Sequence, residues 1–445
     1  MAKSKEKKIQ DSSKIYSFLR RYVDFMIHRA YYRLKYIGTE KIPTDGAIIY
    51  SPNHSNALMD ALVILSLDNS RKVFISRADL FTKPLLAKTL TFLKLMPVNR
   101  IRDGWSNLTK TNETLEKSAD VLKDRVALCI LPEGTHNAQH SLLPVGKGVF
   151  RMAFAGMDKI NDKFPIYIVP VGIEYGNFFR YLSTSLVKIG DPINLNEYIS
   201  DHKELDRAEI MNMGKDHLAE KMKDLILYIP RDEHYQAIWD MTAAIYSLEK
   251  KNVPVIKGES FLERKFRTNR NTLENIHKLR EERPGAAQKL LDIADEFSRN
   301  RLEKKISLKS IIKKSPCVSF IIRCLIFLLT LPFFILSGIL SILVLAVSYA
   351  LTSRSKDKAF HNSIKFVVTL VIWPISMIIW GVLFFIFMPW EYALVSLIIT
   401  SPSVGIVHLL WKNARLMTSD LKLSLSKEVR LKIKELNKLY SDLKQ

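Results

Sequence analysis

The chain has 445 residues and carries 67 Lys and Arg side chains against 45 Asp and Glu, which gives a formal net charge of +22. This length excludes a single small module, and the positive charge favours an anionic partner such as nucleic acid, a membrane surface or a phosphorylated substrate. Three Cys are too few for a disulfide framework, and the N-terminus lacks the apolar core of a secretory signal. We therefore expect the soluble part to face a reducing compartment.

The first element that the sequence predicts is a basic amphipathic helix within residues 1–40. Between residues 13 and 34, apolar side chains recur at helical spacing, with polar and charged side chains opposite them. Residues 1–41 carry 11 Lys and Arg against 4 Asp and Glu, so we expect the helix to suit an anionic bilayer surface. Packing of its apolar face on the protein's own core is the alternative.

Residues 41–200 alternate short β-rich runs with helical patterns. The expected strands cover residues 47–51, 72–76, 125–131 and 166–173. The expected helices cover residues 57–67, 84–93, 106–123 and 148–155. This alternation predicts an α/β domain with a mostly parallel sheet and flanking helices.

The rest of the chain is predicted to be helical. Residues 201–315 follow a charged helical pattern without recognisable chemistry. Within residues 316–411, runs of 30, 25 and 20 residues carry no Asp, Glu, Lys or Arg, at positions 324–353, 366–390 and 392–411. Because about 20 apolar residues cross a hydrocarbon core of roughly 30 Å, two to three transmembrane helices are expected. Residues 412–445 predict a basic C-terminal helix.

The topology of these spans stays open at the level of sequence. Basic residues flank every apolar run, so the positive-inside rule keeps all flanks on one side only if two hairpins form. Residues 366–411 have room for one hairpin. Residues 324–353 cannot make two full spans, so a hairpin there has to be re-entrant or kinked at Pro332 and Gly338.

The first chemical motif follows the first expected strand of the α/β domain. His54 and Asp60 lie where strand 47–51 gives way to a helix. A carboxylate that holds one ring nitrogen of a His allows the other to act as a general base. A purely structural His is the alternative, and the spacing of these two residues alone does not decide between them.

The second motif follows the expected strand 125–131 and reads Leu-Pro-Glu-Gly-Thr-His at residues 131–136. Ligands of open α/β sheets bind at strand ends, so Glu133, Gly134 and Thr135 are candidates for contact with a hydroxylated acceptor. A helix cap or a surface carboxylate is the alternative for Glu133.

Two basic segments and a pair of histidines complete the candidate groups. Arg100, in Met-Pro-Val-Asn-Arg, offers a planar fork for phosphate oxygens, and Lys147 offers a point charge beside two glycines. Lys147 does not belong to a Walker loop, and the chain has no G-x-G-x-x-G pattern, so no dinucleotide cofactor is expected. His136 and His140 lie four residues apart but in a loop, so no metal is expected either.

The order and spacing of these motifs resemble the glycerolipid acyltransferase family, which acylates glycerol-3-phosphate and lysophosphatidate. Within roughly residues 30–200, four blocks carry the resemblance: Asn-His to Asp, Pro-Val-x-Arg, Pro-Glu-Gly and Val-Pro-Val-Gly. The resemblance implies a general base, its orienting carboxylate, a phosphate-binding arginine and an acceptor-contacting acid at, respectively, His54, Asp60, Arg100 and Glu133. The fourth block is apolar and implies a structural role.

Departures from the family pattern narrow the resemblance. Five residues separate His54 from Asp60, where four are usual. His136 stands where the family commonly has Arg, and Lys94 stands where it has Gly. In these departures, in residues 76–79 and 142–144 and in its apolar tail, the sequence resembles fungal-type glycerol-3-phosphate acyltransferases and related bacterial sequences. Glycerol-3-phosphate is therefore the favoured acceptor, with lysophosphatidate close behind.

The resemblance also implies how these groups act. His54 removes the proton of the acceptor hydroxyl as it attacks the thioester of acyl-CoA or acyl-carrier protein, with no acyl-enzyme and no further cofactor. Arg100 and Lys147 hold the phosphate, and backbone amides stabilise the oxyanion. We expect an integral membrane protein whose catalytic domain lies on the cytoplasmic face and whose product leaves into the lipid bilayer.

Two alternatives remain at this stage. One is acylation of another lipid acceptor, such as an aminolipid. The other is a noncatalytic membrane-anchored protein whose positive charge binds anionic lipid. No nucleic-acid partner is expected, because the excess charge is spread over both ends of the chain and no nucleic-acid motif occurs.

Overall fold

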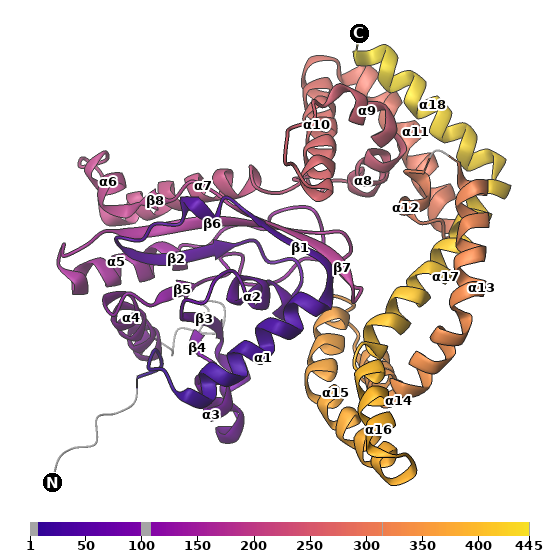
Figure 1. Cartoon of the computed structure of the whole chain (residues 1–445). Helices are drawn as coiled ribbons and strands as arrows, with labels where there is room; N and C mark the ends of the chain where they lie inside the picture. Colours follow the sequence, from indigo (N-terminus) through magenta and orange to yellow (C-terminus); the bar gives the residue numbers. More distant parts are fainter. Residues whose placement is uncertain (1–7, 99–107, 314, 445) are drawn as a thin grey trace. The chain divides into compact units, whose positions relative to one another are not determined.

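The computed structural model describes residues 8–98, 108–313 and 315–444. These residues form two compact units (Figure 1). Unit 1 comprises the described part of Met1–Ile226 together with Ser355–Phe366, and unit 2 comprises Leu227–Arg354 and Val367–Gln445, again where described. All strands of the described residues belong to unit 1, whereas the described part of unit 2 is helical.

Unit 1 is built on a sheet whose spatial order is β1-β7-β6-β2-β5-β3-β4, with β8 also paired to β6. The strands are β1 (Tyr31–Ile37), β2 (Ala47–Pro52), β3 (Lys72–Arg77), β4 (Leu95–Val98), β5 (Ala127–Cys129), β6 (Ile166–Tyr175), β7 (Ser183–Ile189) and β8 (Ile193–Asn194). Among the described strands, β6 pairs antiparallel with β7 and β8, and the other neighbours run parallel. The predicted mostly parallel α/β sheet is confirmed.

Helices pack on this sheet and bury its central strands. They are α1 (Lys14–Ala30), α2 (Leu58–Leu65), α3 (Pro84–Phe92), α4 (Leu108–Lys123), α5 (Gly148–Ile160), α6 (Leu195–Ser200) and α7 (Arg207–Lys223). Ile49 of β2 and Ile168 of β6 are register partners, so their side chains point to the same face. There they share one apolar core with Leu122 of α4 and Phe150 of α5, and all four are fully buried. This core fixes the ends of β2 and β6, where the site begins.

The N-terminal segment differs from its predicted form. α1 ends at Ala30, and Tyr31–Ile37 form β1, which pairs in parallel with β7. The helical spacing predicted through residue 34 is therefore wrong at its end, because aromatic residues fit a paired strand and the pairing outweighs helical periodicity. Met26 and Ile27 are buried in unit 1, whereas Phe18 stays 73% exposed, so α1 packs on its own unit with one face and presents apolar side chains on another.

Two further strands, β4 at one edge of the sheet and β7 between β1 and β6, also lie outside the predicted set. β4 contains Pro97, which lacks a backbone donor and is tolerated at a sheet edge. β7 follows β6 as its antiparallel neighbour. The predicted strand 125–131 is shorter than expected, because only Ala127–Cys129 join the ladder.

Unit 2 contains helices that divide into a polar group and an apolar group. The polar group comprises α8 (Tyr235–Ala244), α9 (Tyr246–Asn252), α10 (Phe261–Glu282), α11 (Pro284–Glu303), α12 (Leu308–Ile311) and α18 (Lys427–Lys444). The apolar group comprises α13 (Pro316–Leu340), α14 (Ile342–Arg354), α15 (Phe360–Phe387, from Val367 on), α16 (Trp390–Thr400) and α17 (Ser403–Leu425). Lys444 and Tyr440 of α18 both bond the buried Glu249 of α9, which ties the C-terminal helix to the polar group.

The apolar group agrees with the predicted two to three spans. In the described chain, α13 and α15 are long and apolar enough to cross a membrane, and α16 with α17 adds a third if this pair, bent by 44°, is one span. Pro332 and Gly338 both lie inside α13, and the first apolar run breaks after Leu340 instead. Arg323 of α13 donates to Asp420 of α17 at 2.8 Å, which pairs the charges that these two helices carry inward.

Candidate active site

The site begins at the carboxyl end of β2, where the side chain of Asn53 continues the ladder to β6. The Asn53 amide oxygen accepts from the Ile173 backbone N–H at 2.6 Å, and its nitrogen donates to the Ile173 carbonyl at 3.2 Å. The Asn53 backbone N–H donates to the Val171 carbonyl. These bonds fix the chain one residue before His54, so the imidazole lies at a strand end, where open α/β sheets bind ligands.

His54 and Asp60 form a close pair. Nδ1 of His54 lies 2.9 Å from Oδ2 of Asp60, and the His54 side chain is 15% exposed. Asp60 is fully buried and also accepts from the Asn56 backbone N–H at 2.7 Å and the Tyr175 hydroxyl at 2.8 Å. A carboxylate held by three donors keeps the proton of the neutral imidazole on Nδ1, so Nε2 is left as an acceptor. This geometry is that of an oriented general base.

The backbone at Ala57 allows the five-residue spacing to work. Ala57 precedes α2 with φ 46° and ψ −124°, a conformation that residues with a Cβ rarely adopt. The turn brings Asp60, in the first turn of α2, back toward His54. A residue held there stores strain of about 1–3 kcal/mol, and such strain persists only where the surroundings fix it. A residue with a strained backbone thus lies between the two members of the pair.

The loop that begins at residue 131 clamps the backbone of His54. Oε1 of Glu133 accepts from the His54 N–H at 2.5 Å, and Oε2 accepts from the Leu143 N–H at 2.8 Å. The Asn137 N–H donates to the His54 carbonyl at 2.9 Å. Burial raises the pKa of Glu133 to about 7, although its two backbone donors oppose that shift. Glu133 therefore positions His54, and its predicted contact with the acceptor stays a prediction.

Of the other predicted site residues, the structure places Gly134 and the segment that carries Lys147 side by side. Gly134 has φ +66°, which suits glycine, and its N–H closes a turn on the Leu131 carbonyl. Thr135 is exposed. The Gly146 N–H donates to the Pro132 carbonyl at 2.9 Å, so the segment that carries Lys147 lies beside this turn. Arg100 lies outside the described residues.

A second imidazole, His136, stands next to His54. The two ring centroids are 5.7 Å apart, with the rings at 73°. Nε2 of His136 lies 2.8 Å from Oδ2 of Asp357, and its ring contacts Phe360. Asp357 and Phe360 belong to unit 1, although 221 residues separate Asp357 from its partner. No local motif could have signalled this contact.

Two further groups escaped the sequence motifs. Tyr175, at the end of β6, holds Asp60 through its hydroxyl. His140 and Glu174 form a buried pair at 2.9 Å that anchors the loop after residue 131 to β6. Glu174 and Tyr175 lie in β6 beyond residue 173, where the sequence predicts the strand to end. For that reason neither residue was a candidate from the sequence. Among the described residues, no group of three His, Cys, Asp or Glu could hold a metal ion.

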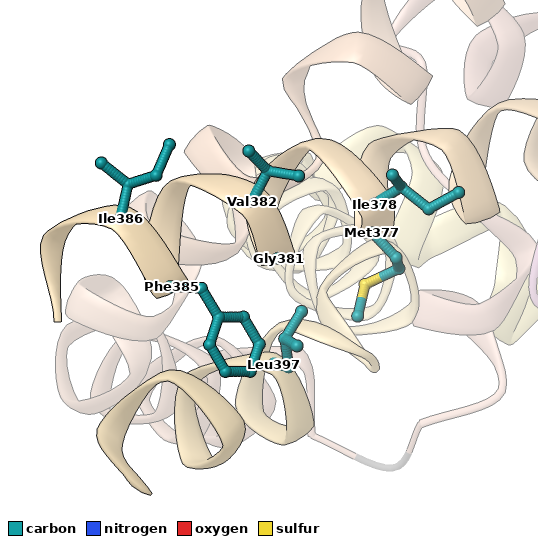
Figure 2. A pocket seen from close by; sticks show the side chains of 7 residues that line it. All are labelled: Met377, Ile378, Gly381, Val382, Phe385, Ile386 and Leu397. Carbon is teal, nitrogen blue, oxygen red and sulfur yellow. The ribbon is translucent and has the colours of Figure 1, made fainter. Parts of the chain in front are cut away.

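A pocket in unit 2 is lined by apolar residues (Figure 2). Its lining belongs to α15 and α16 and comprises Met377, Ile378, Gly381, Val382, Phe385, Ile386 and Leu397. None of these side chains carries a group that titrates or that could act as a general acid or base. The imidazole–carboxylate pairs of the candidate site lie instead in unit 1.

Comparisons with known proteins agree with this location. Residues 33–174 match the family model described as Acyltransferase. A chloroplastic 1-acyl-sn-glycerol-3-phosphate acyltransferase from Brassica napus (BAT2) is 29% identical over 124 residues, 28% of this chain and 34% of that protein. The corresponding protein from Arabidopsis thaliana (LPAT1) is also 29% identical, over 28% of this chain and 33% of its own length. The chain thus spans about a third of these plant relatives.

Two more similarities are shorter or weaker. Glycerol-3-phosphate O-acyltransferase 1 from Saccharomyces cerevisiae is 39% identical over 66 residues, which are 15% of this chain and 9% of that protein. The crystal structure of the 1-acyl-sn-glycerophosphate acyltransferase PlsC from Thermotoga maritima matches with a TM-score of 0.33 and 20% identity, over 47% of this chain and 83% of that one. That TM-score is too low to support a structural argument.

Proposed function

We propose that the protein, whose residues 33–174 match the acyltransferase family model, transfers a fatty acyl group from a thioester donor to the hydroxyl of glycerol-3-phosphate or lysophosphatidate. The observation that carries the proposal is the 2.9 Å contact between His54 and the buried Asp60 at the end of β2. The matched region contains this pair, and an oriented imidazole is what a hydroxyl acceptor requires.

The proposed reaction uses the His54–Asp60 pair in two proton transfers. Nε2 of His54 takes the proton of the acceptor hydroxyl as its oxygen attacks the thioester carbonyl, a contribution of about 10²- to 10⁴-fold in rate. The tetrahedral intermediate then expels the thiolate, which receives the same proton from the imidazolium. Asp60 stabilises the imidazolium between these steps. The new ester bond replaces the thioester, so no acyl-enzyme and no other cofactor is needed.

The acceptor is proposed to be phosphorylated. Lys147 lies on the segment that is hydrogen-bonded beside the Glu133 turn, and Arg100 is predicted to fork the phosphate oxygens. The yeast relative is named for glycerol-3-phosphate and the plant relatives for its 1-acyl derivative. We favour glycerol-3-phosphate, with lysophosphatidate as the second acceptor and acyl-CoA or acyl-carrier protein as the donor.

The apolar helices indicate that the protein is membrane-associated. We propose that the catalytic unit lies on the cytoplasmic face, where acyl thioesters and glycerol-3-phosphate are soluble and where the acylated product can pass into the bilayer. The exposed apolar side chains of the basic helix α1 support contact of unit 1 with that surface.

A comparison of acceptors tests the proposal. The full chain in phospholipid vesicles is given labelled palmitoyl-CoA or labelled palmitoyl-acyl-carrier protein, with glycerol-3-phosphate, lysophosphatidate or an aminolipid offered in separate reactions, and labelled products are separated by thin-layer chromatography. We expect labelled lysophosphatidate or phosphatidate from the first two. Labelling of the aminolipid alone would move the assignment to another lipid acceptor, and no labelled lipid with any acceptor or donor would favour a noncatalytic lipid-binding protein.

A further inference from the structure

The loop between α14 and α15 reaches the site of unit 1. Residues Ser355–Phe366 belong to unit 1, although the chain on both sides of them belongs to unit 2. Asp357 lies 2.8 Å from Nε2 of His136, and the Phe360 ring meets the His136 ring at 79° with centroids 4.8 Å apart. His136 in turn contacts the ring of His54. A connection between two apolar helices thus touches the neighbour of the proposed base.

Asp357 is fixed within its own loop before it meets His136. Its Oδ1 accepts from the Ala359 N–H at 2.8 Å, and its carbonyl accepts from the Phe360 N–H. The hydrogen bond from Ala359 lowers the pKa of Asp357 despite partial burial, and the bond from His136 and the proximity of His361 act in the same direction. The carboxylate is therefore ionised at neutral pH and is aimed by its own turn.

An ionised carboxylate at Nε2 fixes the His136 ring. A proton must stay on Nε2, because two acceptors would otherwise face each other at 2.8 Å. Phe360 supports the ring with an edge contact, so both the ring plane and the direction of Nδ1 are set from the loop. Titratable groups next to this imidazole include Asp357 and His54, and His361 lies beyond Asp357.

We propose that the α14–α15 connection is a positioning element of the acyl transfer, in which Asp357 of the loop and Phe360, the first residue of α15, hold the His136 imidazole against His54 so that the polar acceptor meets two ordered imidazoles. The inference rests on the proposed function. Asp357 acts through His136, so it is a positioning residue. The loop leads directly into α15, a candidate span. Because Asp357 and Phe360 hold His136, the site is complete only when this connection contacts His136.

A double-mutant cycle on the full chain tests this role. Asp357→Ala and His136→Ala should each lower kcat/KM for the phosphorylated acceptor about 10-fold or more, with the KM of the acyl donor unchanged. The double variant should fall no more than about 2-fold below the worse single variant, because the two residues act as one unit. Asp357→Glu should recover part of the loss. Losses that multiply, or that fall equally on donor and acceptor, would overturn the proposal.

The control is an exposed, ion-paired carboxylate away from the site. Asp191 pairs with Lys41 at 2.8 Å on the surface of unit 1, so Asp191→Ala should stay within about 2-fold of the wild type. A comparable loss in Asp191→Ala would show that charge removal, and not the contact with His136, causes the effect.

Amide exchange decides the contact without any reference to activity. In vesicles, residues 355–366 of the wild type should exchange slowly, and His136→Ala should speed their exchange several-fold because the loop loses its partner. Unchanged exchange would show that the loop does not depend on His136. If the wild type acylates no acceptor while the exchange behaves as expected, the proposed reaction fails and the loop contact stands.

Discussion

Two imidazole–carboxylate pairs meet in the site, and they are built differently. His54 and Asp60 lie six residues apart, and the fully buried Asp60 accepts three hydrogen bonds. His136 and Asp357 lie 221 residues apart, and the Asp357 side chain stays 51% exposed. The first pair is fixed by a strand end and the helix that follows it. The second forms only where a distant loop docks, so the two should differ in how much they contribute.

Substitution of each carboxylate by Asn should give the largest difference in activity between the two pairs. Asp60→Asn replaces an acceptor of three donors by an amide, whose NH₂ must face at least one of them, so we expect a loss in kcat of about 10²-fold or more. Asp357→Asn keeps one acceptor oxygen at a half-exposed position and should cost about 10-fold or less. Steady-state kinetics on both variants, with thermal unfolding as the folding control, measure this ratio. Equal losses would break the distinction.

Phosphate recognition can be separated from both pairs. Arg100→Lys keeps the charge but loses the fork, so we expect a 10- to 150-fold loss in kcat/KM, expressed as a raised KM for glycerol-3-phosphate. Each substrate is varied in turn. Arg207→Lys, which alters an exposed bidentate pair with Asp158, is the matched control and should change neither constant. A defect confined to the thioester would place Arg100 at the donor site.

The clamp on His54 predicts a pH dependence of stability. Burial raises the pKa of Glu133 from 4.5 to about 7, so between these values the folded protein binds more protons than the unfolded chain. The contribution of Glu133 is most favourable below pH 4.5 and is lost as the pH rises to about 7, by at most about 3 kcal/mol. Glu133→Gln should remove this slope from the apparent Tm. An unchanged slope would argue against burial of the carboxylate.

The hydroxyl of Tyr175 tests how far the first pair depends on its outer support. Tyr175→Phe removes one donor to Asp60 and should lower kcat about 5-fold, the equivalent of about 1 kcal/mol, with both KM values unchanged. Tyr167→Phe removes a hydroxyl of the same strand that bonds the exposed Asp45, so it serves as the control. If both variants behave alike, Tyr175 does not act through Asp60.

The strained turn between His54 and Asp60 should give the smallest effect. Ala57→Gly relieves the φ of 46° and should leave the apparent Tm unchanged or raise the stability by about 1 kcal/mol, with kcat retained. Ala155→Gly, in the middle of α5, should instead cost about 1 kcal/mol. Calorimetry on the two variants gives the sign. A destabilised Ala57→Gly would mean that the turn is not strained.

Much of the fold could be predicted from sequence because local patterns determine it. β2, β3 and β6 begin at their predicted residues, since their apolar runs enter a core that buries both faces. β1 was not predicted, because the helical spacing was expected to run through residue 34, and Tyr31–Ile37 form a strand only by pairing with β7. The apolar helices could be predicted from their length, and the break after Leu340 lies two residues beyond Gly338, one of the two positions where the sequence predicts a kink.

The contacts of the site also divide into those that are local in sequence, which could be predicted, and those between distant segments, which could not. His54 and Asp60 could be predicted because they lie close in sequence and flank a strand end. The contact of Asp357 with His136 could not, because it is created by the return of the chain to unit 1 after α14. Glu133 was identified as important, yet the main-chain bonds that its carboxylate accepts depend on the fold of two separate segments.

One measurement tests most directly whether His54 takes the proton of the acceptor hydroxyl. Wild type and His54→Ala, matched for content in vesicles, are given labelled acyl-CoA and glycerol-3-phosphate, and the initial rate of labelled lysophosphatidate formation is compared. We expect a loss of at least about 10²-fold with membrane association intact. A variant that keeps more than about a tenth of the wild-type rate would show that His54 is not the general base.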